Sequence, residues 1–302
     1  MYNPQYGRRV SLKILLFILC MLLGNLNASA QTVFTSRMGE SLNDRRQDYV
    51  HELMKLALDE TVETHGSYLL KRTETPANMK RSIQDLRIGK YENYFVRQSV
   101  SKENLEEFVP VPFPVDLGIV GYRLAFTSRE GELKLKSVNA QDDLTPLRMV
   151  QGIGWLDTDI LRHYGFNVET SNSYESMFKI VAKGRADVYW RGANEVLQEW
   201  KDRQHIKGLV LDKNIILYYP LPRFYLTSKG NEKAAERLYE GLIKAFNTGK
   251  VLKLWKKYYG PSLAFTKLET RKNIRISNPF LKGIDRSYEQ YIYNPFKRLL
   301  EE

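Results

Sequence analysis

Three residues that can hold an anion, Tyr189, Trp190 and Arg191, stand together at the end of a short apolar run. A guanidinium presents five N–H donors in a planar fork that fits a carboxylate or a phosphate, and aromatic rings stack on it. We expect Arg191 to face a binding site beside Tyr189 or Trp155. Its guanidinium should lack a fully satisfying carboxylate, because a poorly hydrated arginine needs a ligand group to complete it. The alternative is an ion pair with Glu195 on the following helix.

Trp155 and Asp157 form a second candidate pair, at the start of a predicted helix. They follow the turn Gly152-Ile153-Gly154, whose backbone N–H groups are positioned to bind an anion. An ordinary tight turn is the alternative. We therefore expect ligand contacts from Trp155 and Asp157 at this helix start.

Two further pairs follow predicted strands: Ser36 and Arg37 after the first, and Arg97 and Gln98 after the third. In open α/β sheets, ligands bind outside the carboxyl ends of the strands. Each pair is therefore a candidate ligand contact. A solvated loop is the alternative for both.

Enzyme signatures are sparse. The segment from His51 to Lys55 lacks the second histidine of a zinc-binding HExxH helix, and neither a Gly-x-Ser-x-Gly elbow nor a phosphate loop occurs. The single cysteine, Cys20, lies in the first thirty residues. We expect no metal, no cofactor and no enzymatic activity. A dehydratase with Glu40 or Glu175 as general acid is the enzymatic alternative.

The candidate residues lie on alternating short apolar runs and amphipathic segments, which is typical of an α/β architecture. Predicted strands cover residues 32–35, 67–72, 91–97, 121–126, 166–169, 187–191 and 215–219. Predicted helices cover residues 44–64, 78–87, 155–164, 173–183, 193–203, 231–247 and 250–259. Gly260-Pro261 should end the last helix. The apolar stripe that starts at Tyr174 recurs at helical spacing, and we interpret it as core.

Proline marks two places where the chain passes between sheets. Residues 108–114 contain three prolines, which exclude a helix and a central strand and predict an extended connector. Residues 220–222 read Pro-Leu-Pro and separate two apolar runs. Two such crossings suggest two lobes.

Four stretches carry a resemblance to a known family. They are Met79-Lys80-Arg81 to Leu86-Arg87-Ile88-Gly89, Gly118-Ile119-Val120-Gly121-Tyr122-Arg123, Ser173-Tyr174-Glu175 to Gly184-Arg185-Ala186-Asp187, and Asn231 through Asn247-Thr248-Gly249-Lys250 to Tyr258-Tyr259-Gly260. The last two are the most specific. The chain resembles the type II periplasmic solute-binding proteins, as a divergent member of bacterial extracellular solute-binding protein family 3.

The resemblance implies a two-lobed α/β fold of the type II periplasmic-binding-protein kind, with two open sheets joined by a two-strand hinge. Lobe 1 should comprise residues 31–122 plus 224–262, and lobe 2 residues 124–222, with a C-terminal extension over residues 263–302. The lobes should close around a small ligand, which is then delivered to an ABC transporter or read by a sensor.

Two positions depart from the amino-acid binders of this family. Their lobe 1 turn carries an arginine that grips the ligand carboxylate, whereas Asn104 stands at that position here. Their lobe 2 acid binds the ligand amine, whereas Gly192 stands here. An ordinary α-amino acid is therefore not the expected ligand.

The first thirty residues predict export. Arg8, Arg9 and Lys13 precede the apolar run 14–23, and Ala28-Ser29-Ala30 has the small-x-small cleavage pattern of a signal peptide. We expect cleavage near Ala30 and a periplasmic protein. A membrane anchor is the alternative, but the run of ten residues is shorter than the roughly 20 that a bilayer span needs.

The whole chain has a net charge of +11. Removing the three basic residues of the predicted signal leaves 43 Lys and Arg against 35 Asp and Glu, or +8. We interpret this basic balance as an aid to solubility, with an anionic ligand or envelope surface as alternatives and no nucleic-acid partner. The sequence thus predicts a monomeric protein that binds a small polar or anionic solute. The alternative is an envelope interaction protein that has lost ligand binding.

Overall fold

The computed structural model describes residues 31–40 and 44–296. The predicted signal peptide and its cleavage site lie outside the described residues. Within those residues, no helix combines the length and apolar character needed to cross a membrane.

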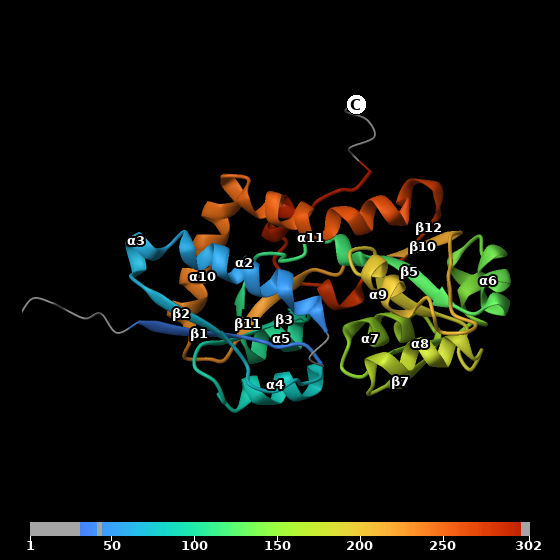
Figure 1. Ribbon diagram of the computed structural model, residues 1–302, viewed down its shortest axis with the longest axis horizontal. Coiled ribbons are helices and arrows are strands. Elements are labelled where there is room, and N and C mark those ends of the chain that lie inside the picture. Colours follow the sequence, from blue (N-terminus) through green and yellow to red (C-terminus); the bar gives the residue numbers. More distant parts are fainter. Residues whose placement is uncertain (1–30, 41–43, 297–302) are drawn as a thin grey trace, which may run out of the picture. The chain divides into compact units, whose positions relative to one another are not determined.

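One five-stranded sheet has the order β2-β1-β3-β11-β4 (Figure 1). Its strands are β1 (Thr32–Ser36), β2 (Tyr68–Arg72), β3 (Tyr94–Ser99), β4 (Val109–Val111) and β11 (Arg223–Thr227). β1 runs parallel to β3, whereas β11 runs antiparallel to both β3 and β4. The proline-rich segment thus forms the short edge strand β4, an outcome that the missing proline N–H allows only at an edge.

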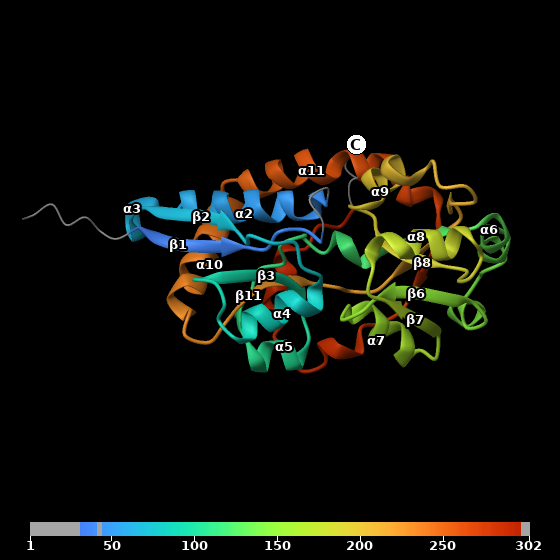
Figure 2. The same cartoon turned by 60° about the horizontal axis from the view of Figure 1, so that its bottom comes forward.

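Helices cover both faces of this sheet (Figure 2). One face carries α2 (Asp48–Asp59), α10 (Glu232–Asn247) and α11 (Lys250–Thr266), and the other carries α4 (Met79–Arg87) and α5 (Lys102–Glu107). Gly241 allows α2 and α10 to approach closely, because a Cβ there would lie 1.9 Å from the Ala57 carbonyl oxygen. The predicted helix 44–64 is divided into a 3-10 turn (Arg45–Gln47), α2 and α3 (Val62–His65).

The second lobe has a sheet of order β12-β10-β5-β8, with β9 also paired to β5. These strands are β5 (Tyr122–Thr127), β8 (Tyr189–Gly192), β9 (Val210–Leu211), β10 (Ile215–Tyr218) and β12 (Lys272–Arg275). A parallel pair, β6 (Arg148–Gly152) and β7 (Asn167–Ser171), meets this sheet through a bridge between Met149 and Val188. The helices are α6 (Arg129–Lys136), α7 (Leu156–His163), α8 (Tyr174–Ala182) and α9 (Val196–Arg203).

The chain crosses to the second sheet before β5 and returns to the first after β10, and these two crossings touch. The Tyr219 N–H donates to the Gly121 carbonyl over 3.2 Å. A Cβ at Gly121 would lie 2.4 Å from the Tyr219 carbonyl oxygen, so only glycine fits this contact. These segments form a two-strand hinge.

The C-terminal part follows a course that the sequence did not predict. α11 does not end at Gly260-Pro261 but continues through Pro261 to Thr266. The helix is held beyond the proline by Ser262, whose hydroxyl donates to the Ala193 carbonyl and accepts from the Leu197 N–H. A tertiary contact thus outweighs the hydrogen bond that proline removes.

Residues beyond α11 join the second sheet and then return to the crossings. β12 pairs in parallel with β10. Asn278 donates from its side-chain amide to the Pro220 carbonyl over 2.9 Å, and the Tyr293 N–H donates to the Leu117 carbonyl over 2.9 Å. The extension therefore contacts both hinge crossings.

Candidate functional site

Among the described residues, cavities with walls from both lobes lie along the cleft, and two of them meet at the ends of the strands. The larger, of about 1110 Å³, has walls from α2 and its preceding turn in lobe 1 and from α8 and α9 in lobe 2. The smaller, of about 40 Å³, lies among the ends of β1, β3, β8 and β11. Both are lined by Arg46, Arg97 and Glu195. The strand ends thus meet where ligands bind in open α/β sheets.

Arg191 lines the smaller cavity, but the expectation of an uncompensated guanidinium is wrong. Its Nη2 donates to Glu195 over 2.7 Å and to Glu199 over 2.7 Å, and its Nε donates to Glu199 over 2.9 Å. The alternative pair with Glu195 is therefore present, and α9 adds Glu199 one turn later. As expected, the guanidinium lies over aromatic rings, 4.9 Å from the Trp155 centroid and 5.3 Å from that of Tyr189.

Strand alternation separates Tyr189 from Trp190, because successive side chains in a strand point to opposite faces. Tyr189 faces Trp155, at 6.4 Å between ring centroids, and its buried hydroxyl has no hydrogen-bond partner among the described residues. Trp190 points into the lobe 2 core, where its indole N–H donates to the Met149 sulfur. The expected cleft position of Trp190 is thus corrected: this side chain lines neither cavity.

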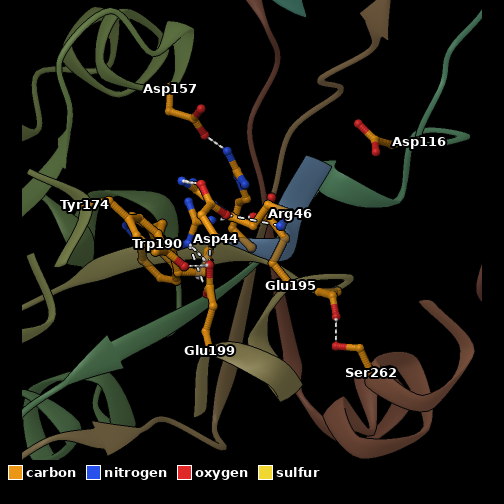
Figure 3. Close-up of polar contacts among 12 residues, drawn as sticks. Asp44, Arg46, Asp116, Asp157, Tyr174, Trp190, Glu195, Glu199 and Ser262 are labelled. Atoms are coloured by element: carbon orange, nitrogen blue, oxygen red, sulfur yellow. Dashed lines mark hydrogen bonds and ion pairs between the residues drawn. The ribbon is translucent and has the colours of Figure 1, made fainter. Parts of the chain in front are cut away.

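Trp155 and Asp157 both line the smaller cavity. Asp157 is 2% exposed, forms an ion pair with Arg123, and accepts a hydrogen bond from the Tyr219 hydroxyl over 2.5 Å (Figure 3). Its carboxylate therefore has partners on β5 and at the second crossing. The turn before α7 also uses its N–H groups internally, since that of Trp155 bonds to the Gly152 carbonyl.

Ser36 and Arg37 are buried at the end of β1. Ser36 contacts the Nδ1 of His51 over 2.6 Å and lines neither cavity between the lobes. Arg37 lines the smaller cavity, donating to the Ser82 hydroxyl over 2.8 Å and to the Ala77 carbonyl over 2.6 Å. Arg37 is thus anchored within lobe 1 by these two bonds.

Arg97 and Gln98 also reach the smaller cavity, and Arg97 borders the larger one as well. Arg97 is 6% exposed, and Nη1 donates to Asp116 over 2.8 Å. Burial lowers the pKa of Arg97, but Asp116, Tyr259 and Glu195 together outweigh it and the net direction is upward. The Gln98 side-chain oxygen accepts from the Ser99 N–H. These two predicted positions therefore lie at the cavity.

Arg223, at the start of β11, is a site residue that sequence reasoning missed. Its side chain is 14% exposed and lies 3.8 Å from Asp116 and 3.7 Å from Glu195, too far for a hydrogen bond. Among the described residues its guanidinium donates no hydrogen bond. Burial, and then repulsion from Arg97, lowers the pKa of Arg223 to about 10. Only the pairing of β11 with β3, which sets Arg223 opposite Ser99, brings this side chain to the site.

A second missed residue, Arg46, connects the lobes. Its guanidinium carbon lies 3.8 Å from the ring centroid of Tyr174 on α8, and its Nη2 donates to Asp44 over 2.7 Å (Figure 3). The Tyr174 hydroxyl in turn donates to Glu199 over 2.6 Å. The rest of the Tyr174 stripe is buried, which confirms its interpretation as core.

The structure shows what surrounds Asn104 and Gly192, the two positions that differ from the amino-acid binders of the family. Asn104 donates to the Ser99 carbonyl over 3.1 Å and lines a separate cavity beside α4. A Cβ at Gly192 would lie 2.6 Å from the Asn194 side-chain oxygen and 3.0 Å from Val120 Cγ2. An acidic side chain would thus require its neighbours to move.

The two acids considered for catalysis are both near arginines. Glu40 lies 3.6 Å from Arg37 and 3.5 Å from Arg46. Glu175 lies 2.5 Å from Arg203. Within the described residues, no group of three or more His, Cys, Asp and Glu side chains is arranged for a metal.

No family model and no curated protein matches this sequence. Solved structures do match. An ancestral arginine-binding protein bound to arginine has a TM-score of 0.56 at 14% identity, over 76% of this chain and 99% of that one. An ancestral amino-acid-binding protein, a precursor of cyclohexadienyl dehydratase, has a TM-score of 0.57 at 13% identity, over 76% and 96%.

A third match is a histidine kinase sensor domain with similarity to periplasmic binding proteins, with a TM-score of 0.56 at 16% identity over 76% of this chain and 97% of that one. At such identities the likeness establishes the fold alone. The expected two-lobed fold of the type II solute-binding proteins is thereby confirmed.

Proposed function

We propose that this protein binds a small polar or anionic solute between its two lobes. The observation that carries the proposal is that both lobes contribute walls to the same two cavities, at the ends of the strands. The larger cavity, of about 1110 Å³, is at the upper end of the range of small-molecule sites. Solved proteins of the same fold that bind amino acids support this function.

We assign the ligand contacts to Arg97, Gln98, Trp155 and Arg223, with Arg37 and Tyr189 behind them. Arg191 and Asp157 have a different part in this proposal. Their charges are compensated by Glu199 and Arg123, so they shape the wall and do not provide free charge.

In the proposed setting the signal peptide is removed near Ala30 and the monomer acts in the periplasm without a metal or cofactor. Lobe 1 comprises residues 31–122 plus 224–262, lobe 2 residues 124–222, and the extension residues 263–302. The loaded form is delivered to a transporter or read by a sensor. A sensor domain and a transporter substrate-binding protein with the same fold support both routes.

One observation favours a second candidate, an envelope interaction protein that no longer binds a solute. The space between the lobes is partly filled by contacts of the protein itself, in particular Arg46 of lobe 1 on Tyr174 of lobe 2 and the ion pair of Arg223 with Glu195 at 3.7 Å. Such contacts would hold the lobes together without a ligand.

A thermal-shift screen against a metabolite library separates these functions. A ligand at a hundredfold excess over its Kd stabilises the folded protein by about 2.7 kcal/mol, which raises the melting temperature by several degrees. A saturable shift supports solute binding. A library without a single stabilising compound would contradict it and favour the interaction protein. Conversion of a stabilising compound into a product would indicate a dehydratase-like enzyme.

A further inference from the structure

We propose that Arg97 and Arg223 form an oxyanion-binding pair, which takes the carboxylate, phosphate or sulfate group of the solute. This inference rests on the proposed function of the same cleft and names the chemical class of its ligand. It also moves anion capture from the clamp position at Asn104 to the paired strands β3 and β11.

The strand register places the two guanidiniums on one face of the lobe 1 sheet. Arg223 pairs with Ser99, and Tyr225 pairs with Arg97, in the antiparallel ladder between β11 and β3. Opposite residues share a face, as do residues two apart in one strand. Arg97 and Arg223 are therefore diagonal neighbours on this face, and both line the smaller cavity.

The hydrogen-bonding capacity of this pair is largely unused. A guanidinium has five N–H donors. Within the described part of the chain, Arg97 donates one side-chain hydrogen bond, to Asp116, and Arg223 donates none. Arg191, which lines the same cavity, bonds to two carboxylates. The free donors of Arg97 and Arg223 face the cavity, so a ligand oxygen that accepts from them gains a strong, charge-assisted contact.

The nearby carboxylates compensate Arg223 only in part, because neither comes within hydrogen-bond distance of it. Asp116 Oδ1 is bonded to Arg97 and to the Tyr259 hydroxyl, and its Oδ2 stays 3.8 Å from Arg223, while Glu195 is bonded to Arg191 and stays 3.7 Å from Arg223. Burial, and then repulsion from Arg97, lowers the pKa of Arg223, although Glu195 and Asp116 act in the opposite direction. An anion between the two arginines would relieve this repulsion.

The sizes of the cavities indicate how such a solute would lie. One water needs roughly 10–15 Å³ of cavity volume, so about 40 Å³ accommodates a group of a few heavy atoms. Arg97 also borders the larger cavity, which has tyrosine side chains in its wall, including Tyr49 and Tyr258. We therefore place the oxyanion in the smaller cavity and the rest of the solute in the larger one.

The test is calorimetric titration of the full protein with inorganic phosphate, sulfate and acetate at constant ionic strength set by sodium chloride. At least one of these anions should bind saturably. Arg223→Met should weaken that binding about 30-fold or more, as expected when a buried charge partner is lost. Arg223→Lys keeps the charge but loses the planar fork, so its affinity should fall between those of the unsubstituted protein and Arg223→Met.

Arg129→Met is the matched control, because it removes the same charge from a side chain that is 80% exposed and paired with Glu132. Its affinity should stay within about twofold of the unsubstituted protein. Equal weakening in Arg129→Met and Arg223→Met would indicate a general surface-charge effect and overturn the inference. The test relies on the two Arg223 variants and not on Arg97→Met, because the latter would leave Asp116 without its bonded arginine and affect folding.

The two levels of proposal fail differently. If none of the three anions binds while neutral compounds from the library do, the oxyanion pair is refuted and solute binding stands. If neither the anions nor any library compound binds, both are refuted. If one or more of the anions bind, the preference among phosphate, sulfate and acetate identifies the head group of the solute.

Discussion

Arg191 and Arg223 line the same small cavity, yet their charges are compensated in opposite ways. Arg191 lies between Glu195 and Glu199, both within 2.7 Å of its Nη2. Arg223 has no carboxylate closer than 3.7 Å. A buried charge is stable only with a partner. The comparison therefore separates an arginine that completes the protein from one that a ligand can complete.

The largest expected effect is the loss of folding stability when Arg191 is replaced. Arg191→Met leaves two buried carboxylates without their common partner, and breaking such a buried pair typically costs about 3 to 5 kcal/mol. Urea unfolding should show that loss in the free energy of unfolding. Oxyanion affinity, measured on the folded fraction, should change far less than in Arg223→Met. Unchanged stability with lost affinity would instead restore Arg191 as the ligand arginine.

Glu195 bonds to Arg191 and lies 3.7 Å from Arg223, so its charge acts on both arginines and tests the comparison through pH. Burial raises the pKa of Glu195, but the charges of Arg191 and Arg223 outweigh it and the net direction is downward. The stability from its charge is thus fully present above the unfolded-state pKa of about 4.3 and is lost as pH falls below it.

Glu195→Gln should accordingly lower the free energy of unfolding by about 1 to 3 kcal/mol at pH 7, because the neutral amide pairs less well with two buried arginines. The gap to the unsubstituted protein should narrow as the pH falls below about 4. Urea titrations between pH 3 and 7 measure it. A gap that is the same at every pH would show that the charge of Glu195 is not responsible.

Arg223→Met should have a small effect on stability, less than about 1 kcal/mol, because its ion pairs are long and it donates no hydrogen bond within the described chain. Thermal unfolding without added anion measures this. A loss as large as that of Arg191→Met would mean that Asp116 and Glu195 depend on Arg223, and the contrast between the arginines would disappear.

Asn104→Arg should have the smallest effect on the ligand. It restores the arginine that amino-acid binders carry at this turn, but Asn104 lines a different cavity from the one that Arg97 and Arg223 share. Oxyanion affinity in calorimetry should change by less than about twofold. A large gain would place the anion site at the original clamp position and not at β3 and β11.

The sequence predicted the elements well where periodicity was strong. The helices 78–87, 173–183 and 231–247 and the strands near residues 32, 122 and 215 lie within a few residues of their observed bounds. It missed α5, α6 and β6, and did not place β12, because short segments of mixed polarity have no clear period. The course of the extension depends on strand pairing with β10, which is distant in sequence.

The candidate site was predicted only in part, for a related reason. Arg37, Arg97, Gln98, Trp155, Asp157, Tyr189 and Arg191 do line a cavity or support its wall. Trp190 and Ser36 do not. Strand alternation points Trp190 into the lobe 2 core, and the Ser36 hydroxyl bonds to His51. Arg46 and Arg223 were missed, since nothing in the neighbouring sequence distinguishes them from arginines on the surface.

What the sequence determined by itself was the two-lobed α/β architecture, through apolar periods, helix stops and the crossing at Pro220-Leu221-Pro222. Periodicity is local, and it suffices to say which faces are buried. Only the tertiary structure decided which arginine is compensated. Glu199 of α9 bonds to Arg191 of β8, whereas Asp116 bonds to Arg97 through Oδ1 and leaves its Oδ2 3.8 Å from Arg223. The balance of charge in a closed space depends on distances of a few ångströms between remote segments, and no local pattern encodes these distances.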